Sequence, residues 1–471
     1  MNTLHRYGAL LAGPVIFGGV LMLLNGLFSF SQAVAIGLIF WMGIWWILRP
    51  VSITVTSLLP LAINAVFDLV PMVKVTGQYF SDIIVLILAS DLISHSWAST
   101  GLDKRLALKA LSFMGNSLTQ QICVWLSAAT LLSIFLPNVI VTSILTPVAI
   151  SMLAFVGDKD IRKSKLAIPI LLAIVWGAGI GGFGSPIGGV ANLVIIHYLE
   201  QLIGHEFMYL SWIPKFFPFL IAVFGLNLLY IYRMPTEIKT LPGSKAFCQK
   251  LYAEIGSISK NEIFCLVVFL AATVLSFIRP VFAEALPGMK PAYIFLLMAF
   301  AFFILPVDSG KPLLRWEDIE KKVMWGLLIL YGGGLALGAI ITNTGAAQRA
   351  GELLTLLPID GGIGTVFIFN TFSTIMTEVS SNTSAAAIAM PVVISTAESL
   401  HVPPIGYAVL ASICVNCAYM LPVSIRAIPV SHGLDAAVLF RYGFKLSLYN
   451  IILVTVLGYL AILYWPGFVE F

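Results

Sequence analysis

Thr377-Glu378-Val379-Ser380-Ser381-Asn382-Thr383 places a carboxylate, four hydroxyls and an amide in the middle of an apolar stretch, residues 364–397. Polar groups inside a membrane are costly unless partners satisfy them, so such a cluster usually marks the path of a substrate or an ion. The neutral donors stand at the start of an expected short helix, residues 384–393, whose N-terminus offers free N–H groups and the positive end of a dipole. This pattern favours a site for an anion.

The rest of the chain indicates a membrane protein with many crossings. Of the 471 residues, 59% are hydrophobic and only 10% are charged, whereas soluble domains carry about 25% charged residues. Apolar segments follow one another at 8–28, 31–48, 53–70, 82–98, 119–155, 166–201, 211–232, 262–279, 291–306, 323–342, 364–397, 403–431 and 446–466. No sizeable domain is left outside the bilayer, and no cofactor, metal cofactor or nucleic acid partner is expected.

Two of these segments are too long for one crossing, which needs about 20 residues. Segment 119–155 is broken at Leu136-Pro137-Asn138, and segment 364–397 is broken at Ser380-Ser381-Asn382. Each is expected to form two half-helices that meet at a polar tip, as in a re-entrant hairpin.

Two further segments are expected to be unwound transmembrane helices, because residues 181–189 and 421–424 interrupt them. The order hairpin, broken helix, plain helix then occurs twice, at about 119–232 and 364–466. Gly/Pro-interrupted segments paired in two halves point to a transporter with its binding site at the repeat interface. The expected domains are scaffold helices at 1–118 and 233–345, the latter opening with a cytoplasmic loop, and transport-domain repeats at 119–232 and 346–471.

The positions of the basic residues predict the orientation in the membrane. Of the 26 Lys and Arg residues, 18 lie in the segments 104–109, 159–165, 233–260, 311–322 and 441–445. One topology places all of these segments in the cytoplasm. The N-terminus is then cytoplasmic, the C-terminus is outside, and the two hairpins enter from opposite sides. The fold class is therefore predicted to be an all-α polytopic membrane protein with inverted repeats.

Several motifs resemble those of the divalent anion/sodium symporter family of carboxylate transporters, over nearly the whole length. They are Trp45-Trp46 followed by Thr56-Ser57-Leu58-Leu59-Pro60, the loop residues 101–107, Thr377-Glu378 with Ser381-Asn382-Thr383, and Tyr419-Met420-Leu421-Pro422-Val423. The resemblance implies an elevator-type transporter of small dicarboxylates, with a moving substrate domain and a scaffold that forms a homodimer in the cell (cytoplasmic) membrane.

The chain departs from this family at the positions that build its two sodium sites. The family's first Ser-Asn-Thr falls on Pro137-Asn138-Val139, and its two Thr-Pro-Pro-Asn loops fall on residues 189–192 and 425–428. A serine, two threonines and an asparagine are missing, and Arg426 has appeared. The resemblance leaves room for one degenerate sodium site near Ser133, Asn138 and Gly189.

The resemblance and the polar tips together give the candidate substrate-binding residues: Asn138, Val139, Gly189, Ser381, Asn382, Thr383 and Arg426. Two facing amides, Asn138 and Asn382, suit the two carboxylates of one dianion. The alternative is that the tip residues only satisfy their own backbone, as Ser, Thr and Asn readily do.

Other residues are candidates for coupling or charge compensation. Arg426 cannot lose its charge and requires a partner: Glu378, the substrate, or the position of a sodium ion in relatives. Glu378 could instead brace the tip as an acceptor. His432 could couple protons or simply end a helix, and Ser133 and Thr377 could add oxygen ligands or bond within their helices.

The first functional hypothesis is sodium-independent exchange of small dicarboxylates of the succinate, malate, fumarate and 2-oxoglutarate class. A fixed arginine would compensate the dianion, and an empty carrier with unbalanced charge would cross slowly. The alternative is sodium symport. Proton symport ranks lower. A channel also ranks lower because no selectivity-filter repeat is present, and an intramembrane enzyme because no catalytic Ser or paired-Asp motif is present.

Overall fold

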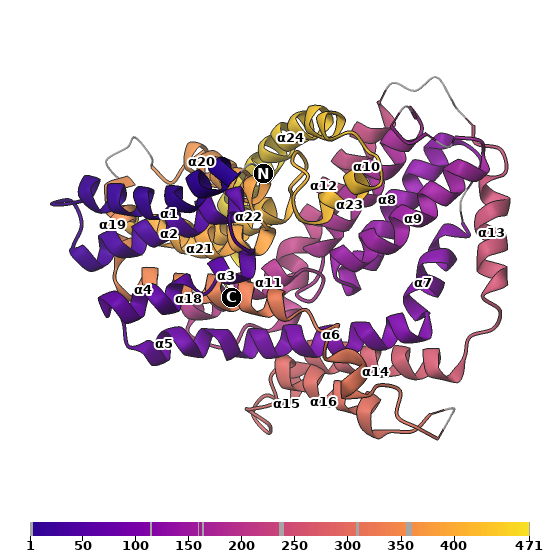
Figure 1. Ribbon diagram of the computed structural model, residues 1–471, viewed down its shortest axis with the longest axis horizontal. Coiled ribbons are helices and arrows are strands. Elements are labelled where there is room, and N and C mark those ends of the chain that lie inside the picture. Colours follow the sequence, from indigo (N-terminus) through magenta and orange to yellow (C-terminus); the bar gives the residue numbers. More distant parts are fainter. Residues whose placement is uncertain are drawn as a thin grey trace.

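The computed structural model describes residues 3–113, 115–158, 160–162, 164–234, 240–307, 310–354 and 360–470, which form helices joined by turns and loops (Figure 1). Within these ranges, eight helical stretches are long and apolar enough to cross a membrane: Phe30–Leu48, Met72–Thr100, Leu118–Phe135, Asn138–Phe155, Tyr209–Tyr232, Lys260–Phe277, Trp325–Asn343 and Ala436–Tyr464. The expected all-helical membrane protein is thus confirmed.

The N-terminal helices gather around α18 (Trp325–Asn343), which contacts α2 to α6 and η1. This group comprises α1 (Thr3–Leu23), α2 (Phe30–Leu48), α3 (Ile53–Thr56), α4 (Leu59–Phe67), α5 (Met72–Thr76) and η1 (Gly77–Phe80). The single segment expected at 53–70 is two helices, because the chain turns at Ser57-Leu58 and Pro60 suits the start of a new helix.

A second group follows the long helix α6 (Asp82–Thr100), which runs lengthwise below the centre of Figure 1. It contains α14 (Lys260–Phe277), α15 (Arg279–Phe282) and α16 (Pro291–Ile304), with α7 (Leu102–Leu111), α13 (Ser244–Glu254) and α17 (Trp316–Ile319) in the connections. Ser259 and Glu262 form a capping box that fixes the start of α14.

The two segments with predicted polar breaks are helical pairs. The first is α8 (Leu118–Phe135) and α9 (Asn138–Phe155), followed by α10 (Ala167–Gly182), α11 (Val190–Ile203), η2 (Tyr209–Ser211) and α12 (Trp212–Tyr232). The second, preceded by α19 (Ala346–Leu354), is α20 (Ile363–Val379) and α21 (Asn382–Ser399), followed by α22 (Pro404–Asn416), η3 (Ser424–Arg426), α23 (Ala427–Ser431), α24 (Ala436–Tyr464) and α25 (Pro466–Val469).

These boundaries confirm where the breaks fall and correct two lengths. The short helix expected at 384–393 begins at Asn382 and continues to Ser399, because Pro391 lies inside the helix without ending it. The helices α8 and α9 have 18 residues each. At 1.5 Å per residue each is about 27 Å long, close to the thickness of a bilayer core rather than half of it.

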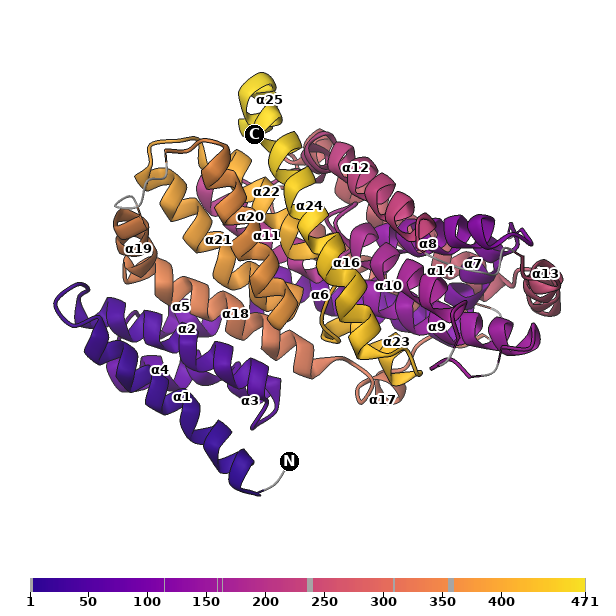
Figure 2. The same ribbon diagram turned by 90° about the horizontal axis from the view of Figure 1, so that it is seen from above.

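The two helical sets pack in the same way and also exchange partners. In the first set α10 packs on α8, α9 and α12, and in the second α22 packs on α20, α21 and α24. The two sets meet where α12 packs on α24, which crosses the molecule diagonally in Figure 2. In addition α11 packs on α21, while η3 and α23 pack on α9. Each set therefore completes the other.

Candidate functional site

A cavity of about 370 Å³ lies between the two helical sets and the α2–α6–α18 region. One wall comes from the two tips and the two breaks: residues 137–140, 187–191, 193, 379–384, 416, 423, 424 and 428. The other wall comes from the end of α2, from α3, α6 and α18. The structure thus brings Asn138, Val139, Gly189, Ser381, Asn382 and Thr383, six of the predicted substrate residues, to one cavity.

The second tip presents its polar groups at the start of α21. Ser381 is the N-cap, and its hydroxyl accepts a hydrogen bond from the Ser384 N–H at 3.1 Å. The Ser380 hydroxyl donates to the Met376 carbonyl at 2.6 Å. The serines at this tip are thus partly used in capping, as the simpler interpretation expected, whereas Asn382 and Thr383 follow inside the first turn.

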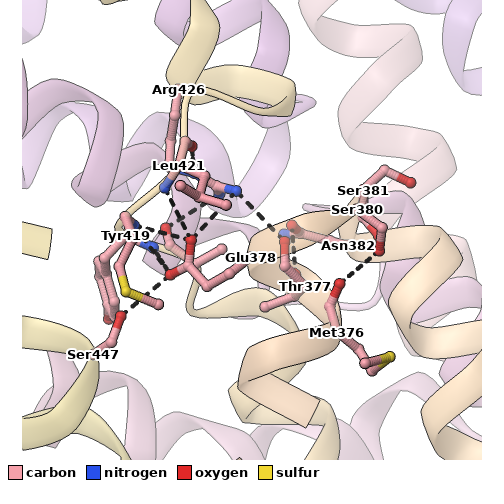
Figure 3. A network of polar contacts seen from close by, with 12 residues as sticks. Met376, Thr377, Glu378, Ser380, Ser381, Asn382, Tyr419, Leu421, Arg426 and Ser447 are labelled. Carbon is pink, nitrogen blue, oxygen red and sulfur yellow. Dashed lines mark hydrogen bonds and ion pairs between the residues drawn. The ribbon is translucent and has the colours of Figure 1, made fainter. Parts of the chain in front are cut away.

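The Asn382 amide is held from one side by Thr377 (Figure 3). The Thr377 hydroxyl lies 2.9 Å from Asn382 Oδ1 and 2.6 Å from the Val415 carbonyl oxygen, and its one proton is shared between these acceptors. Thr377 itself is fully buried and does not line the cavity. It therefore acts on Asn382 rather than on a ligand, and the Asn382 Nδ2 group, which donates to no residue that the structure describes, is available for a ligand.

The first tip offers a helix N-terminus without a side-chain cap. Asn138 is the first residue of α9, its N-cap is Pro137, and within the described residues the helix start has no side-chain capping hydrogen bond. Val139 is 41% exposed at the same place and contributes no polar group. Backbone donors left free at a helix start attract anions. This tip therefore supplies an amide and backbone N–H groups, whereas the second tip carries hydroxyls as well.

The two breaks are joined by a pair of buried asparagines. Asn192 Nδ2 donates to the carbonyl oxygens of Gly182 (2.6 Å) and Ser185 (2.8 Å), which satisfies the first break. Asn416 Nδ2 donates to Asn192 Oδ1 at 3.0 Å, and Asn416 also lines the cavity. Sequence reasoning missed Asn416, because it precedes the recognised motif and reads as part of an apolar helix.

Glu378 and Arg426 form a closed network beside the cavity (Figure 3). The Glu378 carboxylate accepts hydrogen bonds from the N–H groups of Tyr419 (2.5 Å), Met420 (2.9 Å) and Leu421 (3.2 Å) and from the Ser447 hydroxyl. Its Oε2 lies 3.8 Å from Arg426 Nη2, and both side chains are 2% exposed. The carboxylate thereby satisfies the non-helical backbone that follows α22.

The Arg426 guanidinium uses its remaining donors on main-chain carbonyls. Nε donates to Leu421 at 2.6 Å, Nη1 to Ala418 at 3.2 Å and Nη2 to Thr377 at 3.5 Å. Arg426 is not among the residues that line the cavity. The predicted pairing with Glu378 is confirmed, whereas direct contact with a bound substrate has no support in this geometry.

His432 also lies away from the cavity. It follows the last residue of α23, is exposed, and its Nδ1 is 2.9 Å from the Ile428 carbonyl oxygen. This position matches the simpler of the two expected roles for His432, the end of a helix, rather than proton coupling.

Backbone oxygens converge next to Ser133, where a degenerate sodium site was expected. A Cβ atom at Gly188 would lie 2.6 Å from the Ser133 carbonyl oxygen, 2.9 Å from that of Gly182 and 3.0 Å from that of Ile134. The position therefore requires glycine. The Ser133 side chain is fully buried, and its hydroxyl has no hydrogen-bond partner among the described residues. Two of these oxygens are already engaged, because Gly182 accepts from Asn192 and Ile134 accepts from Ser185, so the Ser133 hydroxyl is the polar group that this close packing leaves over.

The opposite wall carries two charged residues that sequence reasoning did not assign to the site, Arg49 and Asp91. Arg49 is the C-cap residue of α2, and Asp91 lies in the middle of α6. Neither residue stands out in the sequence. Arg49 resembles the flanking charge that commonly ends a membrane span, and Asp91 belongs to no recognised motif.

Comparisons with known proteins place these features in context. A family model described as citrate transporter (CitMHS) matches residues 43–414. The chain is 28% identical to the sodium-dependent dicarboxylate transporter SdcS of Staphylococcus saprophyticus, over 96% of this chain and 91% of that one. It is 26% identical to SdcS of Staphylococcus aureus, over 94% and 90%. The fold is similar to the crystal structure of the Alcanivorax borkumensis YdaH transporter, with a TM-score of 0.54, 14% identity, and coverage of 84% and 88%.

Proposed function

The chain belongs to the citrate transporter family, and we propose that it carries small dicarboxylates of the succinate, malate, fumarate and 2-oxoglutarate class across the cell membrane together with sodium. It is a transporter and not an enzyme. The observation that carries the proposal is the single cavity to which both polar tips contribute an asparagine, Asn138 and Asn382. The relatives named as sodium-dependent dicarboxylate transporters support the same substrate class.

The donors at the two tips suit a dianion because they are neutral and come from two sides. Asn138 and Asn382 are each the first residue of an 18-residue helix, so the positive ends of α9 and α21 both lie at the cavity. The substrate would bind with one carboxylate at each tip. Alternatively, the two oxygens of a single carboxylate would bridge the two tips. Thr383, Ser381 and the Gly189 backbone would complete the site.

Sodium symport has better support than the exchange mechanism that the sequence favoured. The exchange hypothesis depended on an arginine whose charge is unbalanced when no substrate is bound. Glu378 lies 3.8 Å from Arg426 and neutralises it permanently. The fixed pair therefore offers no net positive charge to a dianion at the tips, where mobile cations would supply the compensation. One such sodium ion would bind near Ser133, Asn138 and Gly189, where the Ser133 hydroxyl is buried and has no hydrogen-bond partner among the described residues.

The proposed architecture is that of an elevator. The two sets α8–α12 and α20–α24 would be inverted repeats that move as one transport domain, and the tips would belong to re-entrant hairpins. Their parallel packing and the exchange of α11 and α23 support this. The proposal includes a homodimer formed by the scaffold, a cytoplasmic N-terminus and a C-terminus outside. Lys159, Lys163 and Lys239, which contribute to the predicted orientation, and Phe471 at the C-terminus lie outside the described residues.

Uptake of labelled succinate by proteoliposomes should require an inward sodium gradient. In choline buffer we expect initial uptake to fall at least tenfold, whether or not the vesicles contain unlabelled succinate, because no fixed positive charge at the tips replaces the ion. Lithium and potassium buffers of equal ionic strength serve as controls for a general salt effect. Uptake in choline that depends on internal succinate would instead establish exchange.

The variant Asn138→Ala should raise the KM for succinate by roughly 3- to 10-fold. The loss corresponds to one hydrogen bond of about 0.5–1.5 kcal/mol, because the free N–H groups at the start of α9 would remain. Ile140→Val, at a position that lines the same cavity without a polar group, is the matched control. An Asn138→Ala protein with the KM of wild type would rule out the clamp formed by two amides.

A further inference from the structure

Arg49 is the cationic residue among those that line the cavity, within the described part of the chain. The tips and breaks on the opposite wall present amides, hydroxyls and backbone groups, all of them neutral. The cavity volume of about 370 Å³ is within the range of sites for drug-sized ligands, so a four-carbon dicarboxylate held at the tips would leave space towards the other wall.

The local backbone fixes Arg49 at this wall. It ends α2 in the left-handed conformation, with φ 50° and ψ 47°, and its N–H bonds to the Trp45 carbonyl. Pro50 follows and cannot continue the helix. The Arg49 side chain is exposed, and neither a hydrogen bond nor an ion pair of its guanidinium occurs among the described residues. An unpaired cation thus borders a cavity proposed to bind dianions.

Asp91, the carboxylate on the same wall, does not take this role from Arg49. Its Oδ2 accepts a hydrogen bond from the Met324 N–H at 3.1 Å, at the start of α18, and lies 3.6 Å from His95 Nε2. Asp91 is 5% exposed and is engaged in joining α6 to α18. It is not within 4.0 Å of Arg49, since no ion pair joins the two.

We propose that Arg49 is a specificity-determining residue that attracts multiply charged carboxylates into the cavity and interacts with the carboxylate that points away from the tips. The inference rests on the proposed dicarboxylate transport and adds a charged recognition element on the α2 wall. Electrostatic attraction of this kind raises association rates by about 10- to 1000-fold and weakens as ionic strength increases.

The test compares Arg49→Gln with Arg49→Lys in proteoliposomes at constant sodium. Arg49→Gln should raise the KM for succinate roughly tenfold with little change in the maximal rate, and Arg49→Lys should stay close to wild type. Added choline chloride should raise the KM of wild type and of Arg49→Lys but not that of Arg49→Gln. Arg441→Gln is the matched control, because Arg441 is an exposed arginine of α24 that does not line the cavity.

A purely structural role makes different predictions. A cation at a helix C-terminus stabilises the helix by itself, and its loss would lower the amount of folded protein and the maximal rate without changing the KM. That result, or an unchanged KM in Arg49→Gln, overturns the inference while wild-type uptake keeps the proposed function intact. A wild-type KM that does not depend on ionic strength overturns it without any variant. Absence of dicarboxylate uptake by wild type refutes the proposed function and this inference with it.

Discussion

Replacing Asn382 by alanine should remove most dicarboxylate uptake while the protein remains folded. The side chain is the first residue of α21, lines the cavity, and has its oxygen engaged by Thr377, which leaves the NH₂ group for a carboxylate. A hydrogen bond to a charged group contributes about 1.5–3 kcal/mol, or roughly 10- to 150-fold in affinity. At a succinate concentration near the wild-type KM, labelled uptake would fall to roughly 1–20% of the wild-type rate.

Two neighbouring variants make this experiment specific. Ser380→Ala lies at the same tip, but its hydroxyl bonds to Met376 in its own helix, so transport should persist. Thr377→Val removes the support of the amide without touching the cavity, and should raise the KM less than Asn382→Ala does. Thermal unfolding of the purified proteins checks that each is folded. Uptake by Asn382→Ala at the wild-type rate and KM would remove this residue from the site.

The second large effect is expected at the buried ion pair. Arg426→Ala leaves the Glu378 carboxylate in an environment where both side chains are 2% exposed, and removes the donors to the carbonyls of Leu421, Ala418 and Thr377. Breaking a buried pair in this way costs about 3–5 kcal/mol. We expect a clear loss of thermal stability in detergent and loss of uptake, since the network adjoins the tip that carries Asn382.

A double variant separates structural support from a role in transport. In Glu378→Gln with Arg426→Leu, both charges are gone and a glutamine oxygen at the Oε1 position still accepts from the N–H groups of Tyr419 and Met420, while Leu421 loses its acceptor. Stability should largely return, because uncharged replacements of a buried pair are often tolerated. Recovery of uptake with it would identify the pair as structural. An Arg426→Ala protein that is as stable and active as wild type would contradict the role of this pair altogether.

The fold was predictable where the sequence changes character abruptly. Leu136-Pro137 and Ser380-Ser381 interrupt long apolar runs, and the structure ends α8 and α20 and starts α9 and α21 at these places. Helix lengths were less predictable, because a proline such as Pro391 can lie within a helix when a neighbour donates to the carbonyl that it leaves free, as the Tyr198 hydroxyl does to Ala387. The site was predicted only on the side of the tips, where polar residues stand out from an apolar background.

The contributions from distant elements were not predictable. Asn416 and Asp91 belong to no recognised motif in their helices, and only packing decides that both face the cavity. Arg426 was correctly identified as requiring a partner, and Glu378 was among the candidates. The place of Arg426 outside the cavity lining depends on how the turn after Asn416 packs on the end of α20. There three carbonyls and one carboxylate surround the guanidinium. A linear motif gives no information on such an arrangement.

The exchange of helices between the two sets also governs how the protein can be made. The ribosome delivers α8–α12 first, and residues 233–362 follow before α20 begins. Until then α9 lacks its contact with η3 and α23, α11 lacks α21, and Asn192 lacks Asn416. A nascent chain in the bilayer therefore holds a half-formed site with polar groups that have no final partners. Any chain interrupted before α20 lacks the surfaces that would satisfy them, so completion of this transporter is necessarily a late event in its synthesis.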